Sequence, residues 1–182
     1  MSKEFEHILA LHSSPAICGI KASNLINLDI TNFDIEKEVD ELNNKYGKKV
    51  RFYILRKNKN RCLILIYRIE KLKNYIFKSD SMELLLNYGY PKTNNLDVML
   101  DTLSKRINEN LEFPHEIGIF LGYDVSDTYH FIKKDKKELM TGYWKVYSNI
   151  EMKQEIFNRY TKCKNCVLKL IDKGFSIENF MR

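Results

Sequence analysis

The sequence predicts an α+β fold in a single domain spanning residues 1–182. The chain has 182 residues, of which 44% are hydrophobic, and this is enough to build one sizeable core. Hydrophobic residues recur at helical spacing in several segments, and two neighbouring apolar segments are typical of a β-hairpin. Strands and helices do not alternate regularly along the chain, so we do not expect a doubly wound parallel sheet.

Helical spacing of hydrophobic residues occurs along most of the chain, and we expect about six helices. The strongest signal covers 95–110, where leucine and isoleucine recur every three or four positions. Asp34 and Asp124 are candidate N-terminal caps, with Thr31 and Asn32 as alternatives to the first of them. The segments with helical spacing are 3–11, 34–46, 70–78, 81–88, 95–110, 124–134 and 151–173.

About four strands are expected to form one small sheet, mixed or mostly antiparallel. Residues 50–55 and 61–67 are rich in β-branched and aromatic residues, and the connection between them contains two asparagines, which tolerate turn conformations. Residues 116–122 form a short apolar run with two glycines, most simply a buried strand. Residues 143–147 are expected to form the remaining short strand.

Positive charge is concentrated on the predicted hairpin. The formal net charge is +6, but residues 45–78 contain 12 Lys or Arg residues and one acid. A basic hairpin that also carries aromatic rings can follow a phosphate backbone and stack bases. The same composition is typical of a solvated turn, which is the simpler interpretation. The cations of the nucleic-acid alternative are Arg51, Arg56, Lys57, Lys59 and Arg61.

The cysteine and histidine residues do not form a recognisable metal motif. Cys163-Lys-Asn-Cys166 is a CxxC sequence, which is typical of redox pairs and of zinc sites. It lies in the middle of a predicted helix and no second ligand pair follows, so we expect Cys163 to pack as a small hydrophobic residue. His12 follows the first predicted helix, where it either caps the helix end or binds a ligand.

A candidate site for an anion or a cofactor lies where the apolar run 116–122 meets the next helix. Glu116 begins this run, and Tyr123 and Asp124 follow it at the expected N-terminus of a helix. The run does not match the GxGxxG pattern and no P-loop sequence follows, so a nucleotide site is not indicated.

Three stretches together resemble a bacterial family, domain-of-unknown-function family 3793, found mainly in anaerobic Gram-positive bacteria. They are residues 12–25 (HSSPAICGIKASNL), residues 115–132 (HEIGIFLGYDVSDTYHFI) and residues 142–147 (GYWKVY), with Cys163 downstream. The resemblance covers nearly the whole chain. The chain departs from the family pattern at Ser13, where the family usually has cysteine, and at Asp124, where it usually has proline.

The resemblance implies no defined reaction, but it implies a connection with iron or haem, because genes of this family lie near iron-uptake and flavodoxin genes. We expect the matched polar residues to converge on one pocket for a small ligand or cofactor. In a haem version of this prediction, His12 is an axial ligand. The predicted ligand-binding residues are His12, Lys21, Glu116, Tyr123, Trp144 and Tyr147.

Two other classes of function stay open beside the pocket. One is a nucleic-acid-binding module that uses the basic hairpin 45–78, and the other is an interaction protein that docks an acidic redox partner. The sequence does not decide whether the protein is an enzyme. It contains no apolar run long enough to span a membrane and no signal-peptide pattern at the N-terminus, so we expect a cytoplasmic protein without a membrane partner.

Overall fold

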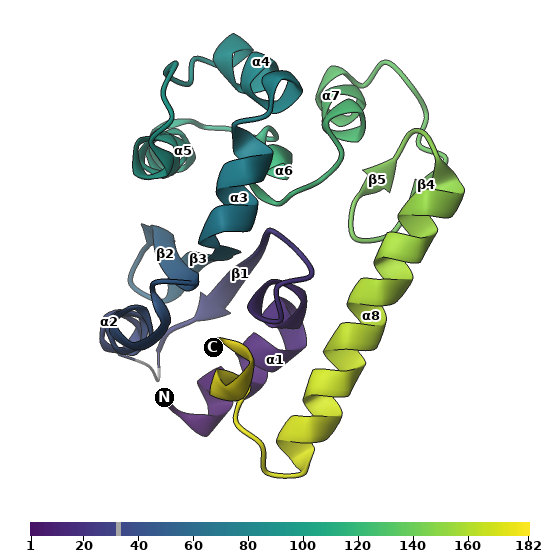
Figure 1. Cartoon of the computed structure of the whole chain (residues 1–182). Helices are drawn as coiled ribbons and strands as arrows, with labels where there is room; N and C mark the ends of the chain where they lie inside the picture. The colour runs from purple at the N-terminus through teal and green to yellow at the C-terminus, as the bar shows by residue number, and fades with distance from the viewer. Residues whose placement is uncertain (32–33) are drawn as a thin grey trace. The chain divides into compact units, whose positions relative to one another are not determined.

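The computed structural model describes residues 1–31 and 34–182, and it has the α+β fold that the sequence predicts (Figure 1). The chain divides into two compact units, which we call unit 1 (residues 1–72 and 160–182) and unit 2 (residues 73–159). Helices α3 (Ile69–Ile76) and α8 (Ile150–Asp172) contribute residues to both units. The single domain expected from the sequence stays a prediction, and the units are described separately below.

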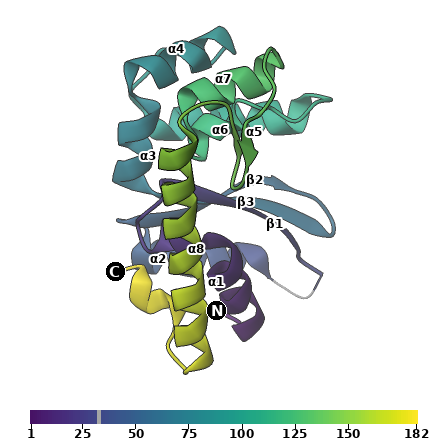
Figure 2. The ribbon, with the colours of Figure 1, turned by 90° about the vertical axis from the view of Figure 1, so that its right-hand side faces the viewer.

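Unit 1 is built on a three-stranded antiparallel sheet with the strand order β1-β3-β2. β1 (Ser23–Asp29) and β2 (Val50–Lys57) both pair with the central strand β3 (Arg61–Arg68). Helices α1 (Lys3–Ile17) and α2 (Ile35–Tyr46) lie on the same face of this sheet, as Figures 1 and 2 show. The predicted hairpin is confirmed as β2 and β3, whereas β1 was not predicted.

The hydrophobic core of unit 1 lies between this face of the sheet and the helices. Ile64 and Ile66 of β3 are fully buried and pack in one cluster with Phe5 and Leu9 of α1 and Val39 of α2. Burying a side chain of this size stabilises a fold by about 1.5–3 kcal/mol. Alternate residues of β3 and residues spaced three or four apart on the helices therefore build one core.

Helix α1 is longer than predicted. It continues to Ile17 instead of ending near residue 11, and Pro15 lies inside its last turn. Proline removes one backbone donor, but the helix persists because the Cys18 N–H still donates to the Ser14 carbonyl at 2.8 Å. His12 therefore lies within the helix, and the prediction that it follows the helix end is wrong.

The end of α1 is stabilised by an arginine from the central strand. Arg68 donates hydrogen bonds to the carbonyls of Ala16, at 3.2 Å, and Ile17, which a helix end leaves without intrahelical partners. Gly19 follows with a φ of +74°, a left-handed conformation that turns the chain out of the helix toward β1.

Unit 2 is mainly helical, and its short strands form a separate two-stranded antiparallel sheet. The helices predicted at 81–88, 95–110 and 124–134 are confirmed within a few residues. The expectation of one four-stranded sheet is wrong, because the strands belong to two sheets. The remaining elements are α4 (Ser79–Asn87), α5 (Leu96–Glu109), α6 (Ile117–Phe120), α7 (Val125–Lys133), β4 (Met140–Thr141) and β5 (Lys145–Val146), with the 3₁₀ helix η1 (Ile177–Phe180) in unit 1.

The strand predicted at 116–122 is wrong, since its centre forms the short helix α6. The Leu121 N–H donates to the Ile117 carbonyl at 2.9 Å, which is a helical hydrogen bond. A short apolar run has no periodicity that distinguishes a buried strand from a buried helical turn. Close packing against α7 favours glycine at position 118, because a Cβ there would lie 2.8 Å from the Thr128 hydroxyl.

The N-terminal caps predicted at Asp34 and Asp124 are confirmed. Each carboxylate accepts a hydrogen bond from the backbone N–H three residues later, at 3.3 Å and 3.1 Å respectively. Thr31 instead donates to Asp29, and Asn32 lies outside the described residues. In residues 1–31 and 34–182, no helix combines the length and the apolar character that crossing a bilayer requires.

The outer edge of β2 is covered at one point by a side chain of α2. Strand order leaves β2 at an edge of the sheet, where backbone groups that point away from β3 have no strand partner. Asn43 Nδ2 donates to the Phe52 carbonyl, and Asn43 Oδ1 accepts from the Phe52 N–H, both at 2.9 Å. One amide side chain therefore replaces a neighbouring strand at this residue.

We predict that Asn43→Ala lowers the free energy of unfolding by about 1–3 kcal/mol, because both edge groups of Phe52 lose their partner. Urea unfolding followed by far-UV circular dichroism measures this loss. Asn44→Ala is the matched control, since Asn44 is an exposed neighbour on the same helix, and it should change stability by less than about 0.5 kcal/mol. Equal losses in the two variants would contradict this role of Asn43.

Candidate ligand pocket

A buried ion pair lies inside unit 2. Lys153 and Asp127 are each 1% exposed, and Lys153 Nζ lies 3.1 Å from an oxygen of Asp127 and 3.1 Å from an oxygen of Asp124. The aspartates come from the start of α7 and the lysine from the first residues of α8. A buried charge without a partner costs several kcal/mol, so the ammonium and the two carboxylates depend on each other.

Asp127 also fixes the position of β5 and its neighbours. Its Oδ2 accepts a hydrogen bond from Trp144 Nε1 at 2.8 Å, and its Oδ1 accepts from the Tyr147 backbone N–H at 2.8 Å. Hydrogen bonds to an ionised acceptor are stronger than neutral ones. The indole is therefore held in one orientation by a carboxylate that is itself neutralised by Lys153.

Aromatic rings surround this charged centre. Tyr123 stacks on Trp144, with ring centroids 4.8 Å apart and planes inclined by 23°. The edge of a further ring, Phe157 of α8, meets Trp144 at a centroid distance of 4.6 Å. A Cβ at Gly142 would lie 2.3 Å from the Phe157 ring, so the close approach of this loop to α8 requires glycine.

A cavity of about 250 Å³ lies beside the stacked pair Tyr123–Trp144. Its buried side includes Asp127, while Phe113 and Phe131 on its exposed side are 38% and 36% exposed. The lining of the cavity comes from the segment before α6, from α6 and α7, and from the chain around β4 and β5. The lining residues are Phe113, His115, Ile117, Gly118, Tyr123, Asp127, Thr128, Phe131, Thr141, Trp144 and Lys145.

Most polar groups of this cavity are already engaged. Both oxygens of Asp127 accept hydrogen bonds, and the Thr128 hydroxyl donates to a backbone carbonyl at 2.9 Å. Lys145 Nζ lies 3.2 Å from Glu138, but this pair is exposed and therefore weak. His115 is exposed and packs edge-on against an aromatic ring. The cavity can thus hold an apolar ring, and His115, Thr141 and Lys145 are polar residues of its lining that solvent reaches.

Two of the predicted ligand residues, Tyr123 and Trp144, line this cavity together. Tyr147 belongs to the same unit, but it contributes its backbone N–H to Asp127 and its ring is outside the lining. Two of the three segments expected to converge, 115–132 and 142–147, therefore meet in unit 2.

Glu116 is hydrogen-bonded to residues that lie outside the cavity lining. It is buried, and one of its oxygens accepts hydrogen bonds from Arg106 Nε at 2.6 Å and from the Tyr90 hydroxyl at 3.3 Å. Burial raises the pKa of the Tyr90 hydroxyl, which therefore stays protonated as a donor. Glu116 fixes α5 relative to the turn before α6 and does not line the cavity.

His12 and its neighbour belong to unit 1. His12 is exposed and, with Glu4 and Leu25, lines a groove of about 300 Å³ between α1 and β1. Haem or iron binding at His12 stays a prediction. Ser13 is fully buried, and within the described chain its hydroxyl has no hydrogen-bond partner. A thiol, which forms weaker hydrogen bonds, would suit that environment.

Lys21 also lies in unit 1, where it is only 2% exposed. Its ammonium donates to the Ser23 carbonyl at 2.5 Å. Burial lowers the pKa of Lys21 to about 7, because removing the ammonium from water disfavours its charged form. The charged form of Lys21 therefore destabilises unit 1 relative to the neutral form.

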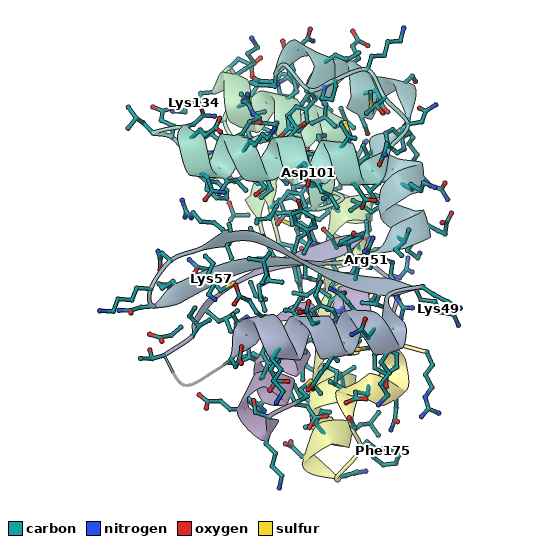
Figure 3. The ribbon with its side chains drawn as sticks, turned by 90° about the vertical axis from the view of Figure 1, so that its left-hand side faces the viewer. Lys49, Arg51, Lys57, Asp101, Lys134 and Phe175 are labelled. Atoms are coloured by element: carbon teal, nitrogen blue, oxygen red, sulfur yellow. The ribbon has the colours of Figure 1, made fainter. Side chains whose placement is uncertain are left out.

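The cations of the basic hairpin do not share one face of the sheet. Leu55 is an extra residue in β2, where the pairing register with β3 shifts. Arg51 and Arg56 therefore lie on one face of the sheet. Lys57 lies opposite Cys62 of β3, on the other face, which packs against the core. Figure 3 shows Arg51 and Lys57 toward opposite ends of the strand.

Several of these cations have protein partners. Lys57 Nζ lies 2.9 Å from Glu36 of α2, and Arg61 donates to the side chain and carbonyl of Asn27 at 3.1 Å and 2.9 Å. Lys59 lies exposed in the turn. This arrangement is typical of a solvated hairpin, and nucleic-acid binding by it stays a prediction.

The CxxC cysteines lie in the middle of α8, as predicted. Cys163 is half-buried against the core of unit 1 and Cys166 is exposed. Cys18, at the end of α1, is half-buried against the same core. Across residues 1–31 and 34–182, no group of three or more His, Cys, Asp or Glu side chains is placed to hold a metal.

The functional residues that the sequence analysis missed are Asp127 and Lys153. Their one available signal is the position of Lys153 on the hydrophobic stripe of α8, in helical register with Phe157 and Tyr160. A lysine on such a stripe indicates a buried ammonium that needs a carboxylate partner. The spacing does not show which carboxylate that is.

These features define a class of α+β protein in which a helical unit carries an aromatic pocket arranged around a buried ion pair. The model of a family of proteins of unknown function, DUF3793, matches residues 9–181, so the chain belongs to this family. The match confirms the resemblance found in the sequence. No curated protein and no solved structure matches the chain.

We predict that Lys153→Met lowers the free energy of unfolding by about 3–5 kcal/mol, because Asp127 is left buried without its counter-charge. Chemical unfolding followed by circular dichroism measures this change. The double variant Lys153→Met, Asp127→Asn should lose less than the sum of the single losses. Lys162→Met, an exposed lysine on the same helix, is the control. A loss at Lys153 as small as at Lys162 would refute the account.

Burial of Lys21 predicts a pH-dependent stability. Its pKa is about 7 in the folded protein and 10.5 for the free side chain, so between these values the unfolded chain binds more protons. The free energy of unfolding therefore rises with pH in this window, by at most about 1.4 kcal/mol per unit, and not below it. Lys21→Met should remove this rise. Identical pH profiles of unfolding in the two proteins would exclude it.

Proposed function

We propose that the protein binds a small, flat and largely apolar ligand in the cavity of unit 2. The observation that carries the proposal is the stacked pair Tyr123–Trp144, whose indole is fixed by Asp127. Rings that are already held in place lose little conformational entropy when a further ring packs against them. A preformed aromatic wall next to a cavity is typical of small-molecule sites.

The dimensions of the cavity restrict the ligand. Its volume of about 250 Å³ is just below the range of about 300–1,000 Å³ that is common for drug-sized ligands. A molecule of one or two rings is therefore favoured. His115 and Lys145 are two of the donors in its lining, so a carbonyl or carboxylate substituent on the ring would find a partner there.

The exposed rings at the cavity give further support. Phe113 and Phe131 are both more than one-third exposed and both line the cavity. Exposed aromatic residues clustered beside a concave site indicate a surface that a ligand covers. A bound ring would remove apolar area from water on both of these side chains.

The proposal concerns binding, and it assigns no reaction. The carboxylates near the cavity, Asp127 and Glu116, are each held by a cation, so neither is placed as a free base. Iron or haem as ligand, and docking of an acidic redox partner, stay predictions from the sequence. We place the protein in the bacterial cytoplasm, where its cysteines would normally remain reduced.

Trp144 is the single tryptophan of the chain, so its fluorescence reports directly on the cavity. We predict that benzoate and 2-naphthoate change this emission saturably. Phe131→Ala should weaken the binding by about 2- to 10-fold, because one aromatic contact contributes about 0.5–1.5 kcal/mol. Fluorescence titration of the wild type and the variant gives the two affinities.

Tyr129→Ala is the matched control for this titration. Tyr129 is an aromatic residue of the same helix, 45% exposed, and it does not line the cavity. Its removal should leave the affinity unchanged. Equal weakening in both variants, or no saturable response to either probe, would overturn the proposal.

A further inference from the structure

The strand order of the unit 1 sheet places β1 at the edge opposite β2. Hydrogen bonds just beyond the two ends of β1 show how its backbone is oriented. Before β1, the Arg68 N–H donates to the Ala22 carbonyl at 2.9 Å. After β1, the Ile30 N–H donates to the Asn60 carbonyl at 2.9 Å. Bonded and non-bonded pairs alternate along an antiparallel ladder. The even-numbered residues of β1 therefore bond to β3, and the odd-numbered residues direct their N–H and C=O groups away from β3, toward the outer edge.

The part of this edge that an incoming strand can use covers residues 25–29. At the start of β1, the outward carbonyl of Ser23 accepts a hydrogen bond from the buried ammonium of Lys21 at 2.5 Å, so this end is closed. Further along, Arg61 Nη2 donates to the Asn27 carbonyl at 2.9 Å. Arg61 is exposed, so water can replace its bond to Asn27 when a peptide N–H takes over the carbonyl. The edge thus offers a row of backbone donors and acceptors.

A groove of about 300 Å³ runs between this edge and α1. The helix contributes Glu4, Ile8 and His12, which are spaced by four residues and therefore lie on one face. Between Glu4 and His12 the helix rises by about 12 Å. Residues 25–29 of β1 extend over about 13 Å. The two walls have matching lengths, and the groove accommodates a strand of about five residues.

We propose that the edge of β1 binds an extended segment of a partner protein as a fourth, antiparallel strand of this sheet. The backbone of the segment bonds to the outward groups of residues 25–29, and alternate side chains of the segment point toward α1. Strand addition of this kind gains affinity from main-chain hydrogen bonds and specificity from the side chains that line the groove. The site lies in unit 1 and does not depend on the proposed ligand pocket of unit 2.

The groove side chains define two positions in the bound segment. Ile8 is half-buried and offers an apolar contact, and Glu4 is an exposed carboxylate one turn away. Four residues of a helix rise by about 6 Å, and two residues of a strand by about 6.8 Å. An apolar and a basic side chain two residues apart in the segment therefore match Ile8 and Glu4. Asp29 adds negative charge at the same end, but Arg61 lies near it, so the preference for a basic residue rests on Glu4.

The direction of the added strand fixes the order of these two positions. Helix α1 and strand β1 run in opposite directions, so Glu4 lies near the end of β1 and His12 near its beginning (Figure 1). A strand antiparallel to β1 passes the Glu4 end of the groove first. The recognised pattern is therefore a basic residue, any residue and an apolar residue, in this order. A parallel strand would require the reverse order.

Amide hydrogen exchange measured by NMR tests the pairing without any substitution. The probe is a blocked peptide of sequence Thr-Lys-Thr-Val-Thr, whose lysine and valine face α1. In the free protein we expect fast exchange at Leu25 and Asn27, and slow exchange at Ile26 and Leu28, which bond to β3. Peptide at ten times its Kd should slow exchange at Leu25 and Asn27 by about tenfold. Protection of these two amides before peptide is added, saturation that leaves their exchange unchanged, or no binding at millimolar concentration would overturn the proposal.

Methylation of the peptide backbone separates the ladder from the side-chain contacts. The central threonine opposes Asn27 and donates its N–H to β1, whereas the valine N–H points away from the sheet. N-methylation of the central threonine should weaken binding by about tenfold, because a hydrogen bond is lost and the methyl group lies between the strands. N-methylation of the valine is the matched control and should change the affinity by less than about twofold. Equal losses in the two peptides would refute strand addition.

Charge reversal tests the pattern of the segment. Glu4→Lys should weaken binding of the lysine peptide by about 2- to 5-fold and strengthen binding of a peptide with glutamate in place of lysine. Glu155→Lys is the matched control, since Glu155 is exposed on α8 and does not line the groove, and it should leave both affinities unchanged. The reordered peptide Thr-Val-Thr-Lys-Thr should bind the wild type more weakly. A wild type that prefers the glutamate or the reordered peptide, or an unchanged preference in Glu4→Lys, would refute the assigned partner.

Discussion

The contact between the Lys153 ammonium and the Asp127 carboxylate determines much of the arrangement of unit 2. A buried carboxylate has two oxygens to satisfy, and Asp127 uses one for the Trp144 indole and the other for the chain after β5. Lys153 supports this arrangement, because its ammonium, 3.1 Å away, offsets the cost of burying the carboxylate. Trp144, which Asp127 holds, and Tyr123, which stacks on it, form one wall of the cavity, so the shape of the pocket depends on this buried pair.

The elements that the sequence predicted well are those whose signal is local. Helices α2, α5 and α8 have regular apolar stripes, and the β2–β3 hairpin has a turn in which Asn58 accepts from two backbone N–H groups. The end of α1, past Pro15, is bonded by Arg68, which comes from a strand far along the chain. The apolar run at α6 contains too few residues to show whether its hydrophobic positions follow the helical or the strand period. It packs closely against α7 at Gly118.

For the candidate site, aromatic residues were easier to find than charged ones. Tyr123 and Trp144 lie in short segments that stand out in the sequence, and the structure brings them into one cavity. Lys21 also stands out, but its side chain is directed into unit 1, toward the Ser23 carbonyl. The partner of a buried charge depends on the three-dimensional arrangement of two helices, and no spacing along the chain encodes it.

The amide of Asn43 has a consequence for how copies of this protein behave at high concentration. Exposed edge strands recruit further strands, and this is a common route to aggregation. A strand approaching β2 at Phe52 would find both backbone groups occupied and would have to displace the side chain of α2 first. The same two hydrogen bonds that complete the fold at this residue therefore also oppose the pairing of β2 with a strand of another molecule there.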